Sequence, residues 1–210
     1  MPELVDCYVT LEDIKTRLGG GDVDGGETQL GVSITSACRA IDDHCLQTFT
    51  TATTATARTY EPDDAGHVYV DPFHTLTGFI LKTDHADDGT YTTTWTSADY
   101  DLEYFGGSWG QSIGAPWDTI NAVGSYTFPK RNRRRRSVQV TAKWGWASSP
   151  QPVIESARIV SVDLWKRKDA PFGIATGTVE FGGLRIGRDV MAQVESLLKR
   201  YVRTDRGGMA

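Results

Sequence analysis

The chain has 210 residues, of which 39% are hydrophobic, 10% aromatic and 23% charged, with a formal net charge of −5 at pH 7. This length supports one sizeable domain or two small ones, and the apolar content excludes an intrinsically disordered chain. No run of about 18 apolar residues occurs, so we expect no membrane-spanning helix, and the acidic N-terminus predicts no secretory signal.

The charges are distributed unevenly along the chain. Residues 1–129 carry 20 acidic and 5 basic side chains, whereas residues 130–210 carry 7 acidic and 17 basic ones. Folding can interleave these charges and neutralise them. Otherwise the asymmetry predicts two electrical poles, which favour head-to-tail association between copies or contact of a basic face with an acidic partner.

Two helices are predicted near the N-terminus. Thr10 and Asp13 have the spacing of a capping box at the start of a short helix, and Val9 is placed for a hydrophobic staple. A longer helix is predicted over residues 27–49, because apolar residues recur there at helical spacing. Its apolar positions are Leu30, Ile34, Ala37, Cys38, Ile41, Cys45 and Phe49.

The pattern changes to short strands after Phe49. Residues 50–59 are rich in threonine and are predicted to be a linker or an edge strand. From there to about residue 146 the chain predicts a sandwich-like or barrel-like antiparallel lobe. Its strand-like segments are 68–70, 78–82, 91–96, 100–104, 125–128 and 137–144.

Two further amphipathic helices flank a hairpin in the C-terminal part. Ser149 and Pro150 predict a helix start, and Pro171 and Gly173 lie beyond its end. Residues 178–186 alternate around a Gly-Gly turn, which predicts a β-hairpin. The last helix is predicted to begin at Asp189, with an apolar stripe of Val190, Val194, Leu197, Leu198 and Tyr201.

The predicted fold class is therefore α+β. Residues 1–50 and 148–210 form a small four-helix bundle, and residues 51–147 form a large antiparallel β-lobe inserted between helices 2 and 3. The β-hairpin lies between helices 3 and 4.

The densest cluster of like charge is the run from Lys130 to Arg136. Its cationic side chains are Lys130, Arg131, Arg133, Arg134, Arg135 and Arg136. Neighbouring like charges repel one another unless a counter-charge lies nearby. The run therefore predicts contact with DNA phosphates or with an acidic protein face. The third interpretation is a solvated loop without a partner. No aromatic residue interrupts the run, so base stacking is not indicated.

The sequence gives no sign of catalysis or of a cofactor. It contains no nucleophile elbow, phosphate-binding loop or histidine-based triad. Cys7, Cys38 and Cys45 are an odd count without a signal segment, which predicts free thiols, and metal ligation would need three or four converging ligands. We therefore expect no enzyme activity, no cofactor and no metal.

Three tryptophans are candidates for contacts between subunits. Trp144 and Trp146 alternate with Gly145 at a strand end, and Trp165 flanks the apolar stripe of the third helix. Aromatic residues often anchor such contacts. The competing reading for Trp144 and Trp146 is that they fill the junction between the lobe and the helices.

The order of these segments resembles the head-tail connector (adaptor) family of tailed bacteriophages. The resemblance lies in the helix from Ser36 to Phe49, in the stretch from Gly145 to Gly173 and in the closing segment from Ile186 to Arg203. The residues that carry it in the last two are Trp146, Pro152, Val153, Ala157, Leu164, Trp165, Lys166, Arg167, Pro171, Arg188, Asp189, Val194, Leu197, Leu198 and Tyr201.

The resemblance implies a structural virion protein made in the host cytoplasm. It would form a ring of identical subunits, a dodecamer, between the portal protein and a stopper or head-completion protein, with DNA passing non-specifically through the channel and no membrane contact. The C-terminal helix would dock on the portal, with Val190, Val194, Leu197, Leu198, Tyr201 and Arg203 as candidate contacts.

Two other functions are compatible with the residues. One is a nucleic-acid-binding module built on residues 130–136. The other is a virion-surface β-domain that binds carbohydrate or protein through Trp95, Trp109 and Trp117.

Overall fold

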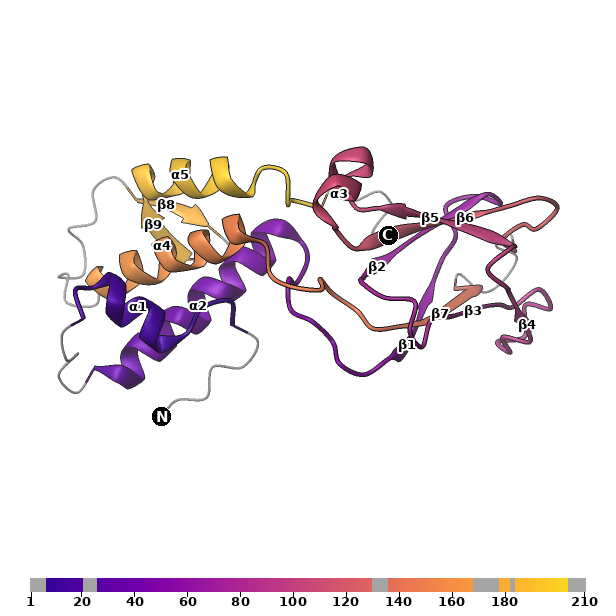
Figure 1. Ribbon diagram of the computed structural model, residues 1–210, viewed down its shortest axis with the longest axis horizontal. Coiled ribbons are helices and arrows are strands. Elements are labelled where there is room, and N and C mark those ends of the chain that lie inside the picture. The colour runs from indigo at the N-terminus through magenta and orange to yellow at the C-terminus, as the bar shows by residue number, and fades with distance from the viewer. Residues whose placement is uncertain (1–6, 21–25, 130–135, 168–177, 182–183, 204–210) are drawn as a thin grey trace. The chain divides into compact units, whose positions relative to one another are not determined.

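The computed structural model describes residues 7–20, 26–129, 136–167, 178–181 and 184–203. It has the α+β class that the sequence predicts, and its described part contains five helices, two antiparallel sheets and a β-hairpin (Figure 1). Met1–Thr50 and Ser148–Thr204 form one compact unit, and residues 51–147 form a second one. We refer to them as the helical unit and the β-lobe.

In the helical unit, α4 (Gln151–Arg167) contacts each of the other described helices. The described elements of this unit are α1 (Leu11–Arg17), α2 (Glu27–Cys45), α4, α5 (Arg188–Leu198) and the hairpin of β8 (Thr178–Phe181) and β9 (Leu184–Gly187). α4 contacts α1, α2, α5 and β9 (Figure 1). A regular four-helix bundle stays a prediction. In the part of the chain that is described, no helix is both long and apolar enough to span a membrane.

The predicted capping box at the start of α1 is confirmed. The Asp13 N–H donates to Thr10 Oγ1 at 3.1 Å, and the Thr10 N–H donates to Asp13 Oδ2 at 2.9 Å. The Thr10 hydrogen bonds hold the pKa of the Asp13 carboxyl below its usual value, with help from Arg158. These bonds satisfy backbone donors that a helix start otherwise leaves unpaired.

We expect Thr10→Ala to lower the free energy of unfolding of the helical unit by about 1 kcal/mol, because it removes the capping acceptor. Urea denaturation followed by far-UV circular dichroism measures this change. The matched control is Thr16→Ala, an exposed threonine at the other end of the same helix. Equal losses in the two variants would contradict a specific role for the cap.

α2 ends four residues before the predicted boundary. Leu46 adopts a left-handed conformation, with φ 54° and ψ 31°, which terminates the helix after Cys45. Gln47 and Phe49 nevertheless stay buried in the unit. Buried residues therefore continue beyond the end of the helix. For this reason the spacing of apolar residues predicted a helix that continues to Phe49.

α4 begins without the predicted serine cap. The Pro150 carbonyl accepts the N–H groups of Val153 and Ile154 at 3.0 and 3.1 Å, so Pro150 occupies the capping position. The Ser149 hydroxyl instead donates to the Phe49 carbonyl at 3.0 Å. Ser149 thus fastens the returning chain to the segment that follows α2.

In its described residues, 51–129 and 136–147, the β-lobe contains two open sheets and no closed barrel. One sheet has the order β1-β7-β3-β4 and the other the order β2-β6-β5, both antiparallel. The bounds are β1 (Thr56–Tyr60), β2 (His67–Phe73), β3 (Ile80–Thr83), β4 (Thr93–Thr94), β5 (Tyr100–Tyr104), β6 (Trp117–Ala122) and β7 (Val138–Ala142), with α3 (Gly107–Ile113) after β5.

A single apolar core joins the two sheets. In the first sheet, Leu81 of β3 lies opposite Val140 of β7, and in the second Val68 of β2 lies opposite Ile120 of β6. All four are at most 1% exposed, and they belong to one buried cluster. Alternate residues of strands from both sheets therefore face the same interior, which is the pattern of packed sheets.

The central strand of the second sheet was not predicted. β6 pairs with β2 on one side and β5 on the other, whereas residues 125–128, predicted as a strand, form none. Polar residues explain the omission, because Asp118 and Thr119 are both buried in β6. Tyr126 donates its N–H to the Val123 carbonyl at 3.3 Å, so its segment is a turn.

Candidate interaction surfaces

The apolar stripe of α5 packs into the helical unit itself. Val194 and Leu198 have no exposed surface, and Tyr201 is 7% exposed. The Tyr201 ring meets Phe49 edge to face, with centroids 6.1 Å apart. Three of the six candidate portal contacts therefore act as core residues in this chain, and a partner would reach them only after the unit opened.

The segment after α5 is attached to the end of α2. The Gln47 side chain donates from Nε2 to the Tyr201 carbonyl at 2.5 Å, and the Arg203 N–H donates to the Cys45 carbonyl at 2.9 Å. These bonds fix the end of the described chain. They place Arg203, a further candidate contact, beside α2, where it is half-buried.

The surface that α5 leaves for a partner is its opposite face. Val190 and Leu197 are half-buried, and the exposed positions of the helix and the following turn are polar, small or charged. These exposed residues are Arg188, Asp189, Ala192, Gln193, Glu195, Ser196, Lys199 and Arg200. We call them, together with Val190 and Leu197, the α5 outer face. It is the part of the predicted docking element that can meet another protein without unfolding.

The basic run lies for the most part outside the described residues. Lys130, Arg131, Arg133, Arg134 and Arg135 belong to that undescribed stretch, and Arg136 is exposed. The two residues that flank the run are joined to each other, because the Ser137 hydroxyl donates to the Pro129 carbonyl at 3.1 Å. Pro129 and Ser137 therefore lie side by side. We call Pro129 and Ser137 the root of the run.

Acidic turns lie against both sides of this root. On one side, the Phe128 N–H donates to the carbonyl of Ala65, within the turn that carries Asp63 and Asp64, at 2.9 Å. On the other side, the Asp84 N–H donates to the Ser137 carbonyl, also at 2.9 Å.

The second acidic turn is held to the run itself. The Tyr91 hydroxyl donates to the Arg136 carbonyl at 2.9 Å, and the same turn carries exposed Asp88. Carboxylates of this chain therefore lie in turns that contact the residues flanking the basic run. Contact of the run with DNA or with an acidic protein face stays a prediction.

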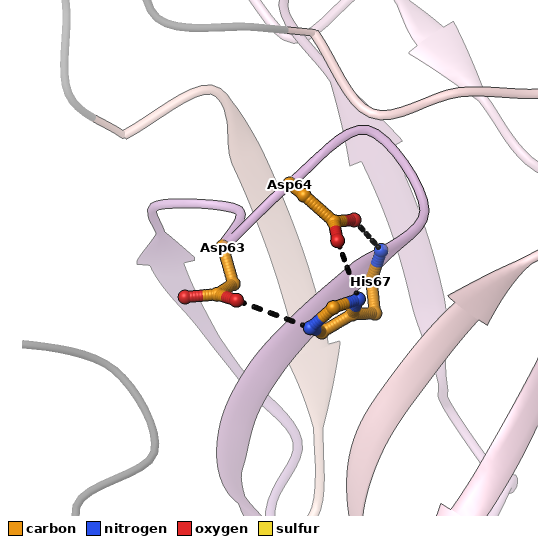
Figure 2. Close-up of side chains that lie close together, drawn as sticks. All are labelled: Asp63, Asp64 and His67. Carbon is orange, nitrogen blue, oxygen red and sulfur yellow. Dashed lines mark hydrogen bonds and ion pairs between the residues drawn. The ribbon is translucent and has the colours of Figure 1, made fainter.

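The first acidic turn contains a compact cluster of titratable groups (Figure 2). His67 lies between two carboxylates, with Nε2 3.1 Å from Asp63 Oδ2 and Nδ1 3.1 Å from Asp64 Oδ2. Asp64 also accepts the N–H groups of Gly66 and His67, at 2.5 and 2.9 Å. These contacts, the Gly66 bond first, lower the pKa of the Asp64 carboxyl.

This trio is poorly arranged for a metal. Its three ligand atoms lie within 4.8 Å of one another, the one such grouping found among the described residues. The two carboxylates, however, contact different nitrogens of the imidazole (Figure 2). An ion at Nε2 would have Asp63 as its second ligand and Asp64 only as a support for Nδ1, which is fewer than protein sites usually supply. The contacts of the trio hold together the turn before β2.

Trp144 and Trp146 are core residues of the β-lobe. They are 4% and 3% exposed. Trp144 donates from Nε1 to the Thr56 carbonyl at 3.0 Å and lies under the Arg58 guanidinium, 4.7 Å from the ring centroid. Trp146 meets Phe105 edge to face, with centroids 5.7 Å apart. This burial leaves little surface of either ring for a neighbouring subunit.

Trp165 differs because it is only half-buried. Its indole covers the start of α2, where a Cβ on Gly26 would lie 2.4 Å from Trp165 Cη2. A residue with a side chain at position 26 would therefore displace the ring. Of the three tryptophans, Trp165 is the one that keeps surface for a contact between subunits.

The aromatic residues suggested for carbohydrate binding do not form an open platform. Trp95 is 5% exposed and stacks on Phe128, with centroids 4.7 Å apart and planes at 9°. Its Nε1 donates to Thr83 Oγ1 at 2.9 Å. Trp109 and Trp117 are half-buried. Trp95 is thus a structural residue of the lobe.

Sequence reasoning missed the role of Tyr8. Its hydroxyl donates to Asp42 Oδ1 and accepts the Phe49 N–H at 3.1 Å. Burial, and then the Asp42 hydrogen bond, raise the pKa of this phenol. Tyr8 therefore joins the N-terminal segment to α2, through Asp42, and to the segment after α2, through Phe49. An isolated tyrosine ahead of a capping box carries no periodic signal that could have identified it.

Comparison with known proteins identifies the fold. Neither a family model nor a curated protein matches the sequence. Two solved structures of gene transfer agent (GTA) particles match almost the whole chain. One is the neck of an empty GTA particle computed with C6 symmetry, at 18% identity and a TM-score of 0.54, covering 99% of this chain and 96% of that one. The other is the virion of a native GTA particle, at 19% identity and a TM-score of 0.53, covering 95% and 93%.

The chain has the fold of these particle proteins. Coverage above 90% in both directions means that the helical unit and the β-lobe are both part of the match. The resemblance to head-tail connectors is therefore confirmed at the level of the fold.

Proposed function

We propose that this protein is a structural subunit of the neck of a tailed, phage-like particle. It is an adaptor ring protein that docks on the portal and links the DNA-filled head to the next ring towards the tail. The observation that carries this proposal is the full-length fold match to a chain of a particle neck. No catalytic step is part of the proposed role, which is assembly.

The proposed ring contains twelve copies and surrounds a channel for DNA. Twelve subunits are compatible with the six-fold symmetry in which the neck of one neighbour was computed, since twelve is a multiple of six. Closed rings need a heterologous interface, in which two different surfaces of each subunit meet. The uneven charge of the chain, acidic before residue 130 and basic after it, suits such head-to-tail contact.

The proposal is tested by locating the protein in mature particles. Purified particles, dissociated into heads, necks and tails, are probed with an antibody against this chain. We expect the chain in the neck fraction together with the portal. Its absence from mature particles, or its presence only along the tail, would exclude an adaptor role.

The α5 outer face is the proposed portal contact. We expect the double variant Ala192→Arg, Ser196→Arg to weaken portal binding at least about tenfold, because large charged groups would occupy a face that must be desolvated. Its stability should change by less than about 0.5 kcal/mol, since both positions are exposed. Portal affinity is measured by biolayer interferometry, with Gln29→Arg on the exposed side of α2 as the control. If the double variant bound the portal with unchanged affinity, the portal would have to bind another surface of this chain.

The basic run is proposed to contact an acidic face of a neighbouring protein. We expect replacement of Arg133, Arg134, Arg135 and Arg136 by serine to weaken ring assembly about tenfold and to flatten its dependence on salt. Assembly is followed by light scattering over a salt series.

A second candidate function, nucleic-acid binding, is favoured by the six cationic residues among the seven of the run. A gel-shift assay of the wild-type chain and the serine variant separates the two. Wild-type affinity for duplex DNA that falls steeply with salt, and that the variant loses, would favour this second function.

A further inference from the structure

Two thiols of the helical unit lie together although they are 31 positions apart in the sequence. The Tyr8 N–H donates to Cys38 Sγ at 3.4 Å, and the Cys7 thiol lies 3.9 Å from Thr35 Oγ1, one turn before Cys38 on α2. The Cys7 and Cys38 side chains also share a hydrogen bond. All three cysteines of the chain are free thiols.

The backbone of Cys7 lies close to the Cys38 sulfur. A peptide nitrogen lies about 2.4 Å from the Cα of the preceding residue, so the Cα of Cys7 is within about 6 Å of Cys38 Sγ. A disulfide needs the two sulfur atoms about 2.0 Å apart. Rotation of the Cys7 side chain towards Cys38 Sγ is one movement that would bring its sulfur closer.

We propose that Cys7 and Cys38 are a redox pair that closes to an intramolecular disulfide when the protein meets a small disulfide oxidant such as oxidised glutathione. The bond would fasten the N-terminal segment to the middle of α2. This inference is independent of the neck function, because it depends only on groups within the helical unit.

The two thiols are suited to different steps of disulfide formation. Cys7 is half-buried, so an oxidant can reach it, whereas Cys38 has no exposed surface. The hydrogen bond from Cys38, with further help from Thr35 and Arg39, lowers the pKa of the Cys7 thiol to about 6. The same hydrogen bond and burial raise the pKa of Cys38. Cys7 is therefore the attacking thiolate and Cys38 the resolving thiol.

The reaction is a balanced pair of exchanges. The Cys7 thiolate attacks one sulfur of oxidised glutathione, which breaks the S–S bond and releases one glutathione thiolate. Cys38 then loses its proton to water and attacks Cys7 Sγ in the mixed disulfide, releasing the second glutathione. The two cysteines are oxidised by two electrons, and one oxidised glutathione is reduced to two thiols.

The bond would stabilise the helical unit. It closes a loop of about 30 residues that includes α1, and cross-links of this size restrict the unfolded chain substantially. Tyr8 and Val9, both buried, already hold the same segment in place, so the native state needs little rearrangement. We expect the thermal midpoint of the unit to rise by roughly 5–15 °C on oxidation.

The test uses the full-length protein incubated with oxidised glutathione. Peptide mass spectrometry should find a Cys7–Cys38 cross-linked peptide with two hydrogens fewer than the free pair, and the thermal midpoint should rise. Cys45→Ala should keep both effects, because Cys45 is buried elsewhere on α2. Cys38→Ala should lose both and should accumulate glutathione on Cys7 instead.

A second readout does not depend on folding stability. The rate of Cys7 alkylation by iodoacetamide should follow a pH profile with its midpoint near 6, and this midpoint should move towards that of an ordinary thiol, about 8.5, in Cys38→Ala. Absence of the cross-linked peptide after oxidation, or an unchanged midpoint in Cys38→Ala, would overturn the proposal.

Discussion

Replacement of Leu198 by alanine is expected to lower the free energy of unfolding of the helical unit by about 2–5 kcal/mol. Leu198 has no exposed surface, and α5 packs on α4, so truncation would leave a cavity in the core of the unit. The change is measured by urea denaturation followed by circular dichroism at the helical band. This would be among the largest losses expected from a single substitution in the unit.

The neighbouring residue provides a matched control. Leu197 has the same side chain on the same helix but is only half-buried, so Leu197→Ala should cost clearly less. Similar small losses for both variants would show that α5 does not pack on its own unit as described. In that case the burial of Val194 and Leu198 would have to come from another protein chain.

Gly110→Ala is expected to destabilise the β-lobe by about 3 kcal/mol or more. A Cβ at this position would lie 1.7 Å from the Phe105 carbonyl oxygen and 2.9 Å from its carbon, which are backbone atoms that cannot rotate away. The Gly110 carbonyl also accepts the Ala115 N–H at 2.9 Å, so the two ends of this region are held together. Denaturation followed by tryptophan fluorescence reports on the lobe, since Trp146 contacts Phe105.

Gln111→Ala is the control for this prediction. Gln111 is exposed on the same short helix, and alanine there removes no acceptor and adds no close contact. We expect its stability to stay within about 0.5 kcal/mol of the wild type. If Gly110→Ala were equally well tolerated, α3 would not rest against the end of β5 as the structure has it.

The sequence predicted best where one periodic pattern decides the structure. The apolar stripe of α4 and the alternating pattern around Gly-Gly in the sequence led to α4 and to the paired strands β8 and β9. β5 was predicted with its observed bounds, Tyr100–Tyr104. In each case local pattern and tertiary packing favour the same conformation.

Prediction failed where tertiary structure overrides the local pattern. β6 places Asp118 and Thr119 in the interior, and α3 forms in a glycine-rich stretch, so neither has the usual composition of its element. The end of α2 depends on a left-handed leucine, Leu46, which periodicity cannot reveal.

The candidate interaction surfaces were also predicted only in part from the sequence. Amphipathic spacing in α5 identified the buried Val194, Leu198 and Tyr201 but also included Val190 and Leu197, which are half-buried. It could not say whether this chain or another one buries them. Likewise the basic run is plain in the sequence, whereas the acidic turns at its root are brought there by the sheets from positions 63–67 and 84–91. Such assignments need long-range contacts that a linear pattern does not contain.

The proposed role is that of a ring-forming subunit that binds the portal. Native mass spectrometry of the purified chain mixed with the portal protein of the same particle tests it most directly. We expect one complex in which a portal ring carries twelve copies of this chain. A chain that stays monomeric beside an intact portal ring would contradict it.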